Sequence, residues 1–123
     1  MMDVLGGNDR VQLNTVEREY QRRQAVALLR AGVAIADTAR IDIRGELHCG
    51  SDVRIDVGAV FEGQVSLADG VSIGPNCVLK NVSVGAGAVV HPMSHLEDCQ
   101  LGDGCSVGPF ARLRTGTVLA DGA

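Results

Sequence analysis

The sequence predicts a mainly β protein, a parallel β-helix of six-residue repeats preceded by one α-helix. Two observations carry this prediction. Between residues 41 and 119, small and apolar residues recur mostly at a step of six, and Gly, Asp or Asn commonly follows them. Before the repeats, residues 14–32 form the stretch NTVEREYQRRQAVALLRAG, which is rich in good helix formers. The two segments differ in periodicity, so we expect two different structures.

The helix is expected to begin at Asn14 or Thr15. Either side chain can accept a hydrogen bond from the first turn, and Glu17 stands three residues after Asn14, as in a capping box. Good helix formers continue to Ala31, and Gly32 then supplies the backbone freedom that commonly ends a helix. The sequence therefore predicts one helix that ends next to the first repeat.

Side-chain spacing on this helix predicts its faces. Val16, Tyr20 and Ala27 lie near one face, and Glu19 and Arg23 have the favourable order for an ion pair four residues apart. The helix also carries several basic residues, which could form a patch for a polyanion, but a solvated helix face is favoured and no function is assigned to them. They are Arg18, Arg22, Arg23 and Arg30.

The repeat segment contains two ladders of inward-pointing residues. The first consists of Ile43, Cys49, Ile55, Phe61, Leu67, Ile73, Leu79, Val84, Val90, Leu96, Leu101, Val107, Leu113 and Leu119. The second lies two residues earlier and consists of Ile41, Leu47, Val53, Ala59, Val65, Val71, Cys77, Val82, Ala88, Ser94, Cys99, Cys105, Ala111 and Thr117. Two inward positions separated by two residues describe a very short strand, and the following Gly, Asp or Asn can form a corner.

A strand and corner of six residues cannot bury their own apolar side, so they must stack on other copies. Three such units make one triangular coil, and coils at the usual strand spacing of ~4.8 Å form a parallel β-helix with a dry interior. The ladder shortens to a step of five between Leu79 and Val84 and again between Leu96 and Leu101. These two slips are 17 residues apart, so both are expected on the same edge of the prism.

Composition and charge exclude several classes of function. The formal net charge of −4 argues against nucleic acid as a partner, because phosphate backbones select basic surfaces. Apolar runs are too short to cross a membrane. The four cysteines contain no CxxC pair, which argues against a zinc knuckle or a disulfide framework and favours the reducing cytoplasm.

Several segments together resemble one bacterial enzyme family. They are GGNDRVQL near the start, the helix stretch EREYQRRQA, RIDIRGEL, and IGPFARLRTG near the end. Over essentially all 123 residues the chain resembles the middle of the bifunctional N-acetylglucosamine-1-phosphate uridyltransferase and glucosamine-1-phosphate acetyltransferase. The resemblance implies a left-handed β-helix that forms homotrimers. It also implies three regions: residues 1–10 as the end of the nucleotidyltransferase domain, 11–31 as the helical linker, and 32–123 as the first coils of the acetyltransferase domain.

The resemblance also implies the chemistry of the complete enzyme. Glucosamine-1-phosphate is acetylated by acetyl-CoA, and the product then receives a uridylyl group from UTP, which gives UDP-N-acetylglucosamine for the cell envelope. Mg²⁺ serves the uridyltransferase site. The family's nucleotide-binding loop would precede Met1, and its catalytic histidine and acetyl-CoA contacts would follow Ala123. We therefore expect no catalytic residue within these 123 residues.

Two residues match positions with a role in that family. Asn8, in GGNDR, corresponds to the asparagine that contacts UDP-N-acetylglucosamine and holds Mg²⁺ together with an Asp outside this chain. An amide oxygen suits such a hard cation. For the isolated segment, a simple turn cap is the alternative role of Asn8. Gly7 stands where the family usually has Val, which weakens this match.

Arg114, in ARLRTG, corresponds to the arginine that binds the sugar phosphate at the acetyltransferase site. A planar guanidinium can hold two phosphate oxygens at once. The alternative is an arginine on a solvated edge. Thr115 stands where the family usually has Pro, so a less rigid corner is expected there.

The other reactive side chains receive no role. Zinc held by histidines on a β-helix would resemble a γ-class carbonic anhydrase, but His91 and His95 do not have that family's ligand spacing. Cys99 and Cys105 belong to the inward ladder, where a thiol acts as a small hydrophobic group.

Two functions are expected from the sequence. In the first, the 123 residues are part of the bifunctional enzyme, as a last repeat that ends in TVLADGA with no capping unit indicates, and they are inactive alone because they lack the family's catalytic motifs. In the second, they form a stand-alone β-helix module that trimerises and catalyses nothing.

Overall fold

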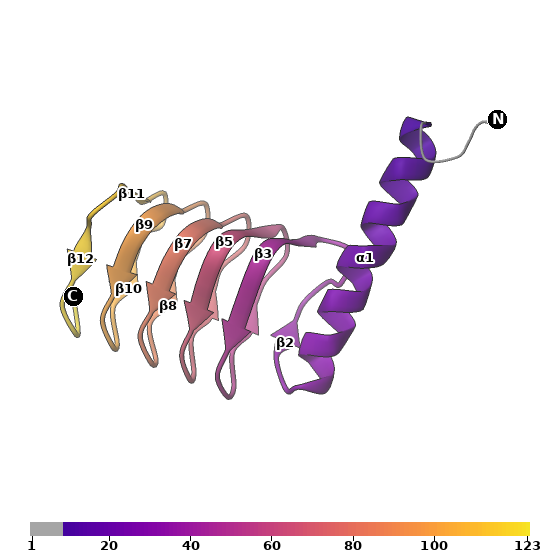
Figure 1. Cartoon of the computed structure of the whole chain (residues 1–123). Coiled ribbons are helices and arrows are strands. Elements are labelled where there is room, and N and C mark those ends of the chain that lie inside the picture. The colour runs from indigo at the N-terminus through magenta and orange to yellow at the C-terminus, as the bar shows by residue number, and fades with distance from the viewer. Residues whose placement is uncertain (1–8) are drawn as a thin grey trace.

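A computed structural model describes residues 9–123, which form one α-helix followed by a stack of parallel coils (Figure 1). The helix is α1 (Arg10–Arg30). The strands are β2 (Ala34–Ile35), β3 (Ile41–Cys49), β4 (Arg54–Ile55), β5 (Ala59–Leu67), β6 (Ser72–Ile73), β7 (Val78–Val84), β8 (Val89–Val90), β9 (His95–Leu101), β10 (Ser106–Val107), β11 (Arg112–Leu113) and β12 (Val118–Leu119). No helix in this range has the length and apolar character needed to span a bilayer.

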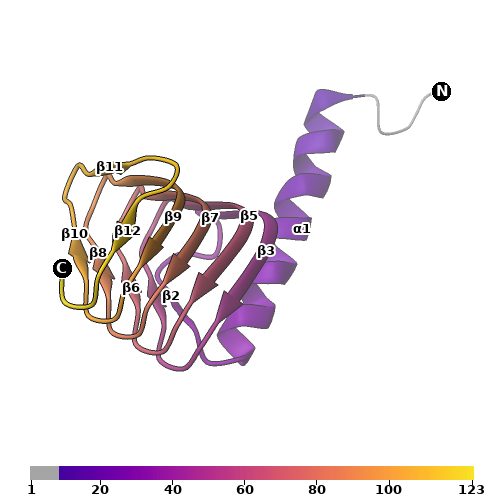
Figure 2. The same ribbon diagram turned by 60° about the vertical axis from the view of Figure 1, so that its left-hand side comes forward.

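The strands pair in parallel and form the sides of a prism (Figure 2). The short strands make a five-stranded sheet in the order β10-β8-β6-β4-β2, and the long strands make a second sheet in the order β11-β9-β7-β5-β3, with β12 also on β9. Each long strand bends where its backbone reaches positive φ, for example at Gly63 in β5 and Asn81 in β7, so it supplies two sides. The predicted parallel β-helix with a preceding helix is confirmed, and its hand stays a prediction from the resemblance.

Every residue of the two predicted ladders points into the prism and is buried or half-buried. Apolar side chains from successive coils stack on one another, so the core is a continuous column with Phe61 its largest fully buried residue. The half-buried members belong to the first and last coils: Leu47, Cys49, Ala111, Leu113, Thr117 and Leu119. Burial of aliphatic surface at about 25 cal/mol per Å² is therefore the main stabilising contribution along the stack.

The two slips lie on one edge, as the sequence predicts. Lys80 pairs with Glu97 and Val82 with Cys99, so Asn81 and Asp98 occupy matching corners of adjacent coils. At the first slip, Asn81 Oδ1 accepts a hydrogen bond from the Gln64 N–H at 2.9 Å. The Asn81 side chain thus accepts a hydrogen bond from the backbone of the preceding coil at the shortened corner. Glycine is needed at position 63, because a Cβ there would collide with Asn81 Oδ1.

The helix begins earlier than the sequence predicts, so the expected cap at Asn14 or Thr15 is wrong. Asp9 is the N-cap, and its Oδ1 accepts from the Val11 N–H at 2.7 Å. Thr15 stays inside the helix because its hydroxyl donates to the Val11 carbonyl, a local bond that helices tolerate. The predicted glycine stop is confirmed: Gly32 has φ 102°, and the Val33 N–H donates to the Leu28 carbonyl beyond it.

The helix face that carries Val16, Tyr20 and Ala27 is not the face that packs against the coils. Val16 and Tyr20 are 68 % and 56 % exposed, whereas the buried helix residues are Gln21 and Ala25. Polar as well as apolar helix residues are buried because of the kind of surface that α1 covers. It packs against β3 and β2 at the end of the stack, where a strand edge presents backbone polar groups as well as apolar side chains.

Gln21 supplies the hydrogen bonds to Ile43 that a neighbouring strand would otherwise make. Its Oε1 accepts from the Ile43 N–H at 2.7 Å, and its Nε2 donates to the Ile43 carbonyl at 3.0 Å. Gln21 is 1 % exposed, so without these bonds the Ile43 N–H would be buried without a partner, and the Ile43 carbonyl would keep only the longer contact from Gln24 Nε2 at 3.4 Å. One side-chain amide therefore closes the edge of the first long strand.

Most helix arginines are ion-paired. Glu19 pairs with Arg22 at 2.9 Å and with Arg23 at 3.0 Å, which confirms the predicted pair. Arg18 differs from the expected solvated position, because its Nη2 lies 2.6 Å from Asp42 Oδ1 and its Nη1 donates to the Ala39 carbonyl. These arginines are held by carboxylates of the chain itself.

We predict that Gln21→Met lowers the free energy of unfolding by about 3 kcal/mol, because the buried Ile43 N–H loses its partner and the Ile43 carbonyl keeps only the longer contact from Gln24. Urea denaturation followed by circular dichroism measures it. Gln24→Met is the matched control, with an expected change below about 1 kcal/mol, because Gln24 reaches the same carbonyl only at 3.4 Å. Equal losses in the two variants would contradict the role given to Gln21.

Candidate functional site

Arg114 lies on the edge of the prism that carries both slips, directly after β11 and before the corner at Gly116. Its side chain is exposed. The coil that holds it is at the opposite end of the stack from α1 (Figure 1). The structure thus places the predicted phosphate ligand where its guanidinium is open to a small molecule.

A polar pocket of about 410 Å³ surrounds Arg114. It is formed by residues of two adjacent coils: His95 and Glu97 from β9, and Arg112, Leu113, Arg114 and Thr115 from the coil of β11. Arg112 pairs with His95 across the coils, and Leu113 with Leu96, so the basic residues lie one coil beyond the imidazole and carboxylate. The pocket therefore combines two guanidinium groups, one imidazole and one carboxylate.

Hydrogen bonds hold the backbone around Arg114. The Thr115 hydroxyl donates to Asp98 Oδ2 at 3.1 Å, and the Gly116 N–H donates to the Asp98 carbonyl at 2.9 Å. Thr117 binds the Arg114 carbonyl through its N–H at 3.1 Å and its hydroxyl at 2.8 Å. Thr115 was expected to loosen this corner, but the structure shows that its hydroxyl ties the corner to the coil beneath.

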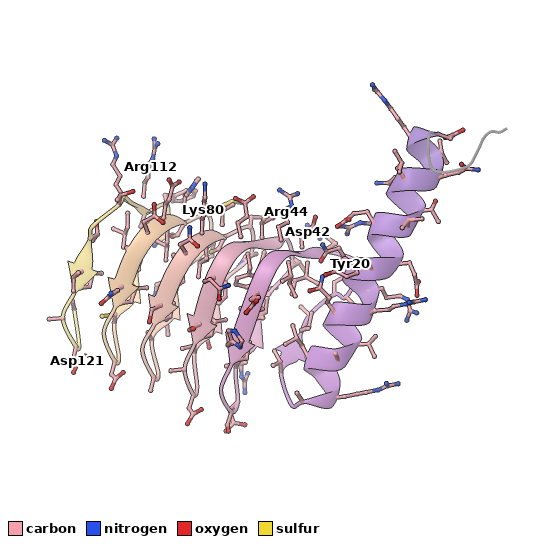
Figure 3. All side chains as sticks on the ribbon, viewed as in Figure 1. Tyr20, Asp42, Arg44, Lys80, Arg112 and Asp121 are labelled. Atoms are coloured by element: carbon pink, nitrogen blue, oxygen red, sulfur yellow. The ribbon has the colours of Figure 1, made fainter. Side chains whose placement is uncertain are left out.

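A column of alternating charge leads to Arg114 along this edge. Arg44 pairs in register with Glu62, Glu62 with Lys80, and Lys80 with Glu97. Arg114 follows Glu97 on the next coil, because Leu113 pairs with Leu96. Figure 3 shows Arg44 and Lys80 projecting from one edge of the stack.

This column is electrostatically complementary at each step. Opposite charges one coil apart attract, whereas like charges at the ~4.8 Å spacing would repel. Only its first contact is a close ion pair, between Arg44 Nη1 and Glu62 Oε2 at 3.2 Å. Within residues 9–123, neither Lys80 nor Arg114 has a carboxylate within 4.0 Å, so both keep their charge available.

Asn8, the predicted ligand of Mg²⁺ and of UDP-N-acetylglucosamine, lies outside the described residues. Within residues 9–123, no three side chains of His, Cys, Asp or Glu are grouped as a metal centre. The metal-binding role of Asn8 and the phosphate-binding role of Arg114 therefore both stay predictions, and they concern two different sites.

The two histidines of the last coils form local contacts. His91 Nε2 lies 2.9 Å from the Ser106 hydroxyl, and His95 Nε2 lies 3.7 Å from Glu97 Oε1. Sequence reasoning gave His95 no role, although the structure puts it in the Arg114 pocket. The register of the repeat could have revealed this, because His95 and Arg112 hold the same position in successive coils.

The cysteine side chains point into the core of the prism. Cys77, Cys99 and Cys105 are buried, and the thiols of Cys77 and Cys105 donate to the carbonyls of His91 at 3.2 Å and Ala120 at 3.0 Å. Burial raises the pKa of the Cys77 and Cys99 thiols, and it raises the pKa of Cys49 to about 11. A protonated thiol is a poor nucleophile, which agrees with the packing role predicted for the inward cysteines.

The chain is similar to known proteins along nearly all of its length. Residues 43–123 match the family model described as the GMPPB C-terminal domain. "Bifunctional protein GlmU" of Burkholderia thailandensis is 57 % identical over 121 residues, 98 % of this chain and 27 % of the relative. The protein of the same name from Janthinobacterium sp. (strain Marseille) is 59 % identical over 116 residues, 94 % of this chain and 26 % of the relative.

A third relative named "Bifunctional protein GlmU", from Chromobacterium violaceum, is 57 % identical over 118 residues, 96 % of this chain and 26 % of the relative. The chain thus spans about a quarter of the length of the curated relatives it matches.

We predict that Cys49 in the folded protein reacts with iodoacetamide at pH 8 roughly a hundredfold more slowly than in urea, because few molecules carry its thiolate when burial raises the pKa to about 11. The alkylated peptide is quantified by mass spectrometry. Since the raised pKa belongs to the folded state, this thiol's stabilising effect is present below pH 9 and is lost as the pH rises towards 11. Equal rates in the folded and unfolded protein would contradict a thiol that stays protonated in the folded protein.

Proposed function

The chain belongs to the GMPPB C-terminal domain family over residues 43–123 and to the family of bifunctional GlmU proteins over nearly its whole length, and on this premise we propose that it carries the sugar-phosphate end of an acetyltransferase site. In this proposal Arg114 binds the phosphate of glucosamine-1-phosphate. The acetyl group then passes from acetyl-CoA to the amino group of the sugar. The reaction belongs to the synthesis of UDP-N-acetylglucosamine, and we place it in the cytoplasm.

The proposal assigns one part of the enzyme to each region of the chain. Residues 1–10 would end the nucleotidyltransferase domain, 11–31 would link the domains, and 32–123 would be the first coils of the acetyltransferase domain. Asn8 would contribute to the site that uses UTP and Mg²⁺ and forms UDP-N-acetylglucosamine. Because Asn8 lies outside the described residues, we derive no step through the metal.

The proposal rests mainly on the exposure, the backbone hydrogen bonds and the unpaired charge of Arg114 within residues 9–123. Its side chain is exposed in a polar pocket, its backbone is fixed by four hydrogen bonds around the corner, and it has no carboxylate partner within residues 9–123. A guanidinium in such a position can bind two phosphate oxygens with little loss of conformational freedom.

These residues would bind and orient the acceptor, and no described residue is assigned the proton transfer. In acetyl transfer the amine attacks the thioester carbonyl, loses a proton and releases the thiol of coenzyme A. The group that removes the proton is expected beyond Ala123. The 123 residues alone are therefore proposed to bind sugar phosphate without turning it over. The alternative is a structural β-helix module that binds neither substrate.

We also propose that copies of the chain assemble as a homotrimer. Met93 and Phe110 occupy the same corner of successive coils, with φ of 62° and 57°, and are 48 % and 77 % exposed. Bulky side chains in this backbone region cost about 1–2 kcal/mol each in isolation. An apolar groove of about 540 Å³ adjoins this corner at His91 and Pro92 and follows the short strands to Leu29. A second copy would cover both features.

We predict that Arg114→Gln weakens the binding of glucosamine-1-phosphate at least about tenfold, because one charge-assisted contact to phosphate is lost. Isothermal titration calorimetry on the protein expressed from its own gene measures the dissociation constant, and thiol release from acetyl-CoA is followed on the same samples.

Lys80→Gln is the matched control for Arg114, because Lys80 is a cation of the same charge column that does not line the pocket and lies two coils away from Arg114. It should leave the dissociation constant within about twofold of the unsubstituted protein. Equal affinity of all three proteins would argue for the structural module instead.

We predict that Phe110→Ser shifts the protein from trimer to monomer at micromolar concentration, since the apolar area of an exposed ring is lost from the interface. Sedimentation velocity distinguishes the two species. Val118→Ser, which removes another exposed apolar side chain on a different side, should leave the trimer intact. A trimer that survives Phe110→Ser places the interface elsewhere on the prism.

A further inference from the structure

We propose that Arg112 is a second phosphate-binding residue, which together with Arg114 makes a pair of guanidinium groups for one phosphoryl group. This inference rests on the proposed function of Arg114 and adds a residue that neither the motif nor the resemblance assigns. It starts from the pocket on the edge of the prism, where the two arginines lie on the same coil.

The strand geometry aims both arginines outward. In β11, Leu113 points into the prism and is half-buried, so its two neighbours in the chain point away from the core. Figure 3 shows Arg112 extending freely from the stack. Two residues along a strand are separated by about 6.6 Å, which is within the reach of two long side chains that converge on one anion.

The positive charge of this pair is not neutralised by its surroundings. Within residues 9–123, neither arginine has a carboxylate within 4.0 Å, whereas Arg18, Arg22, Arg23 and Arg44 all have one. Two carboxylates of the adjacent coil have other partners: Glu97 Oε1 lies 3.7 Å from His95 Nε2, and Asp98 accepts from the Thr115 hydroxyl. Two like charges side by side repel each other, and a bound anion would reverse that repulsion.

A phosphate monoester matches this arrangement better than a carboxylate does. It carries up to two negative charges and three terminal oxygens, enough for two forked donors at once. The pocket of about 410 Å³ is large enough for a phosphorylated monosaccharide. Glu97 lines the same pocket and opposes a free anion, so its charge should lower the affinity for inorganic phosphate.

The test compares three variants of the protein expressed from its own gene: Arg112→Gln, Arg112→Lys and Glu97→Gln. The ligands are glucosamine-1-phosphate, inorganic phosphate and unphosphorylated glucosamine, and calorimetry gives each dissociation constant. Arg40→Gln is the matched control, because Arg40 is also exposed but precedes β3 at the other end of the stack.

We expect Arg112→Gln to weaken both phosphate ligands about tenfold or more and to leave glucosamine unaffected, with partial recovery in Arg112→Lys. Glu97→Gln should bind inorganic phosphate severalfold more tightly, because a like charge leaves the pocket. Thermal midpoints of the Arg112 variants should stay unchanged, which separates loss of a ligand contact from loss of fold.

The outcomes separate this inference from the proposed function. If Arg114→Gln weakens phosphate binding and Arg112→Gln does not, the pair is overturned and the function proposed for Arg114 stands. If neither substitution has an effect, or if the unsubstituted protein binds no phosphate ligand, both are overturned. An unchanged affinity for phosphate in Glu97→Gln would place the anion outside this pocket and would overturn the pair.

Discussion

Every coil of this molecule depends on the backbone hydrogen bonds that it makes with the next coil. A strand edge exposes N–H and C=O groups, and burying them without partners costs more than most side-chain contacts return. Parallel pairing in register meets this constraint throughout the stack, since each coil repeats the shape of the one before it. The small inward residues follow from the same requirement, because a prism of fixed width has room for Val, Ala, Cys and Leu but for few large rings. The glycine and asparagine corners keep that width constant.

At its first edge the stack has no coil to pair with, and α1 takes that place. A purely apolar helix would cover the core but leave the strand edge without hydrogen bonds. The chain instead presents Gln21, whose amide reproduces both partners that a neighbouring peptide unit would offer Ile43. Arg18 adds a contact to Asp42, which in turn meets Arg44 at the beginning of the charge column. The docking face of the helix therefore combines polar Gln21 with apolar Ala25 and Leu28, whereas Val16 and Tyr20 remain exposed.

The regular stacking also positions the candidate site. Residues at the same place in successive repeats lie directly above one another, so Glu97 and Arg114 become neighbours although 17 residues separate them. The shortened corners fall on this edge, and Thr115 and Asp98 join two coils there by a hydrogen bond. A rigid edge with outward charges can hold a phosphate with little reorganisation. In such a fold the outward-facing side chains are free to bind ligands, because the inward-facing side chains form the core.

Much of this protein could be predicted from the sequence alone, because the hexad ladders, the two slips and the glycine after the helix are local signals of backbone shape. The ladders named every inward residue from Ile41 to Leu119. The role that the resemblance of ARLRTG gives to Arg114 stays a prediction. The strand β2 was not predicted, since Val33 and Ile35 precede Ile41 and Ile43 by eight residues instead of six. The docking face of α1 and the grouping of Arg112 with His95 and Glu97 were decided only by tertiary structure. Hydrophobic periodicity reports where apolar side chains are buried, whereas these features depend on which polar groups meet across the edge of a strand or between coils.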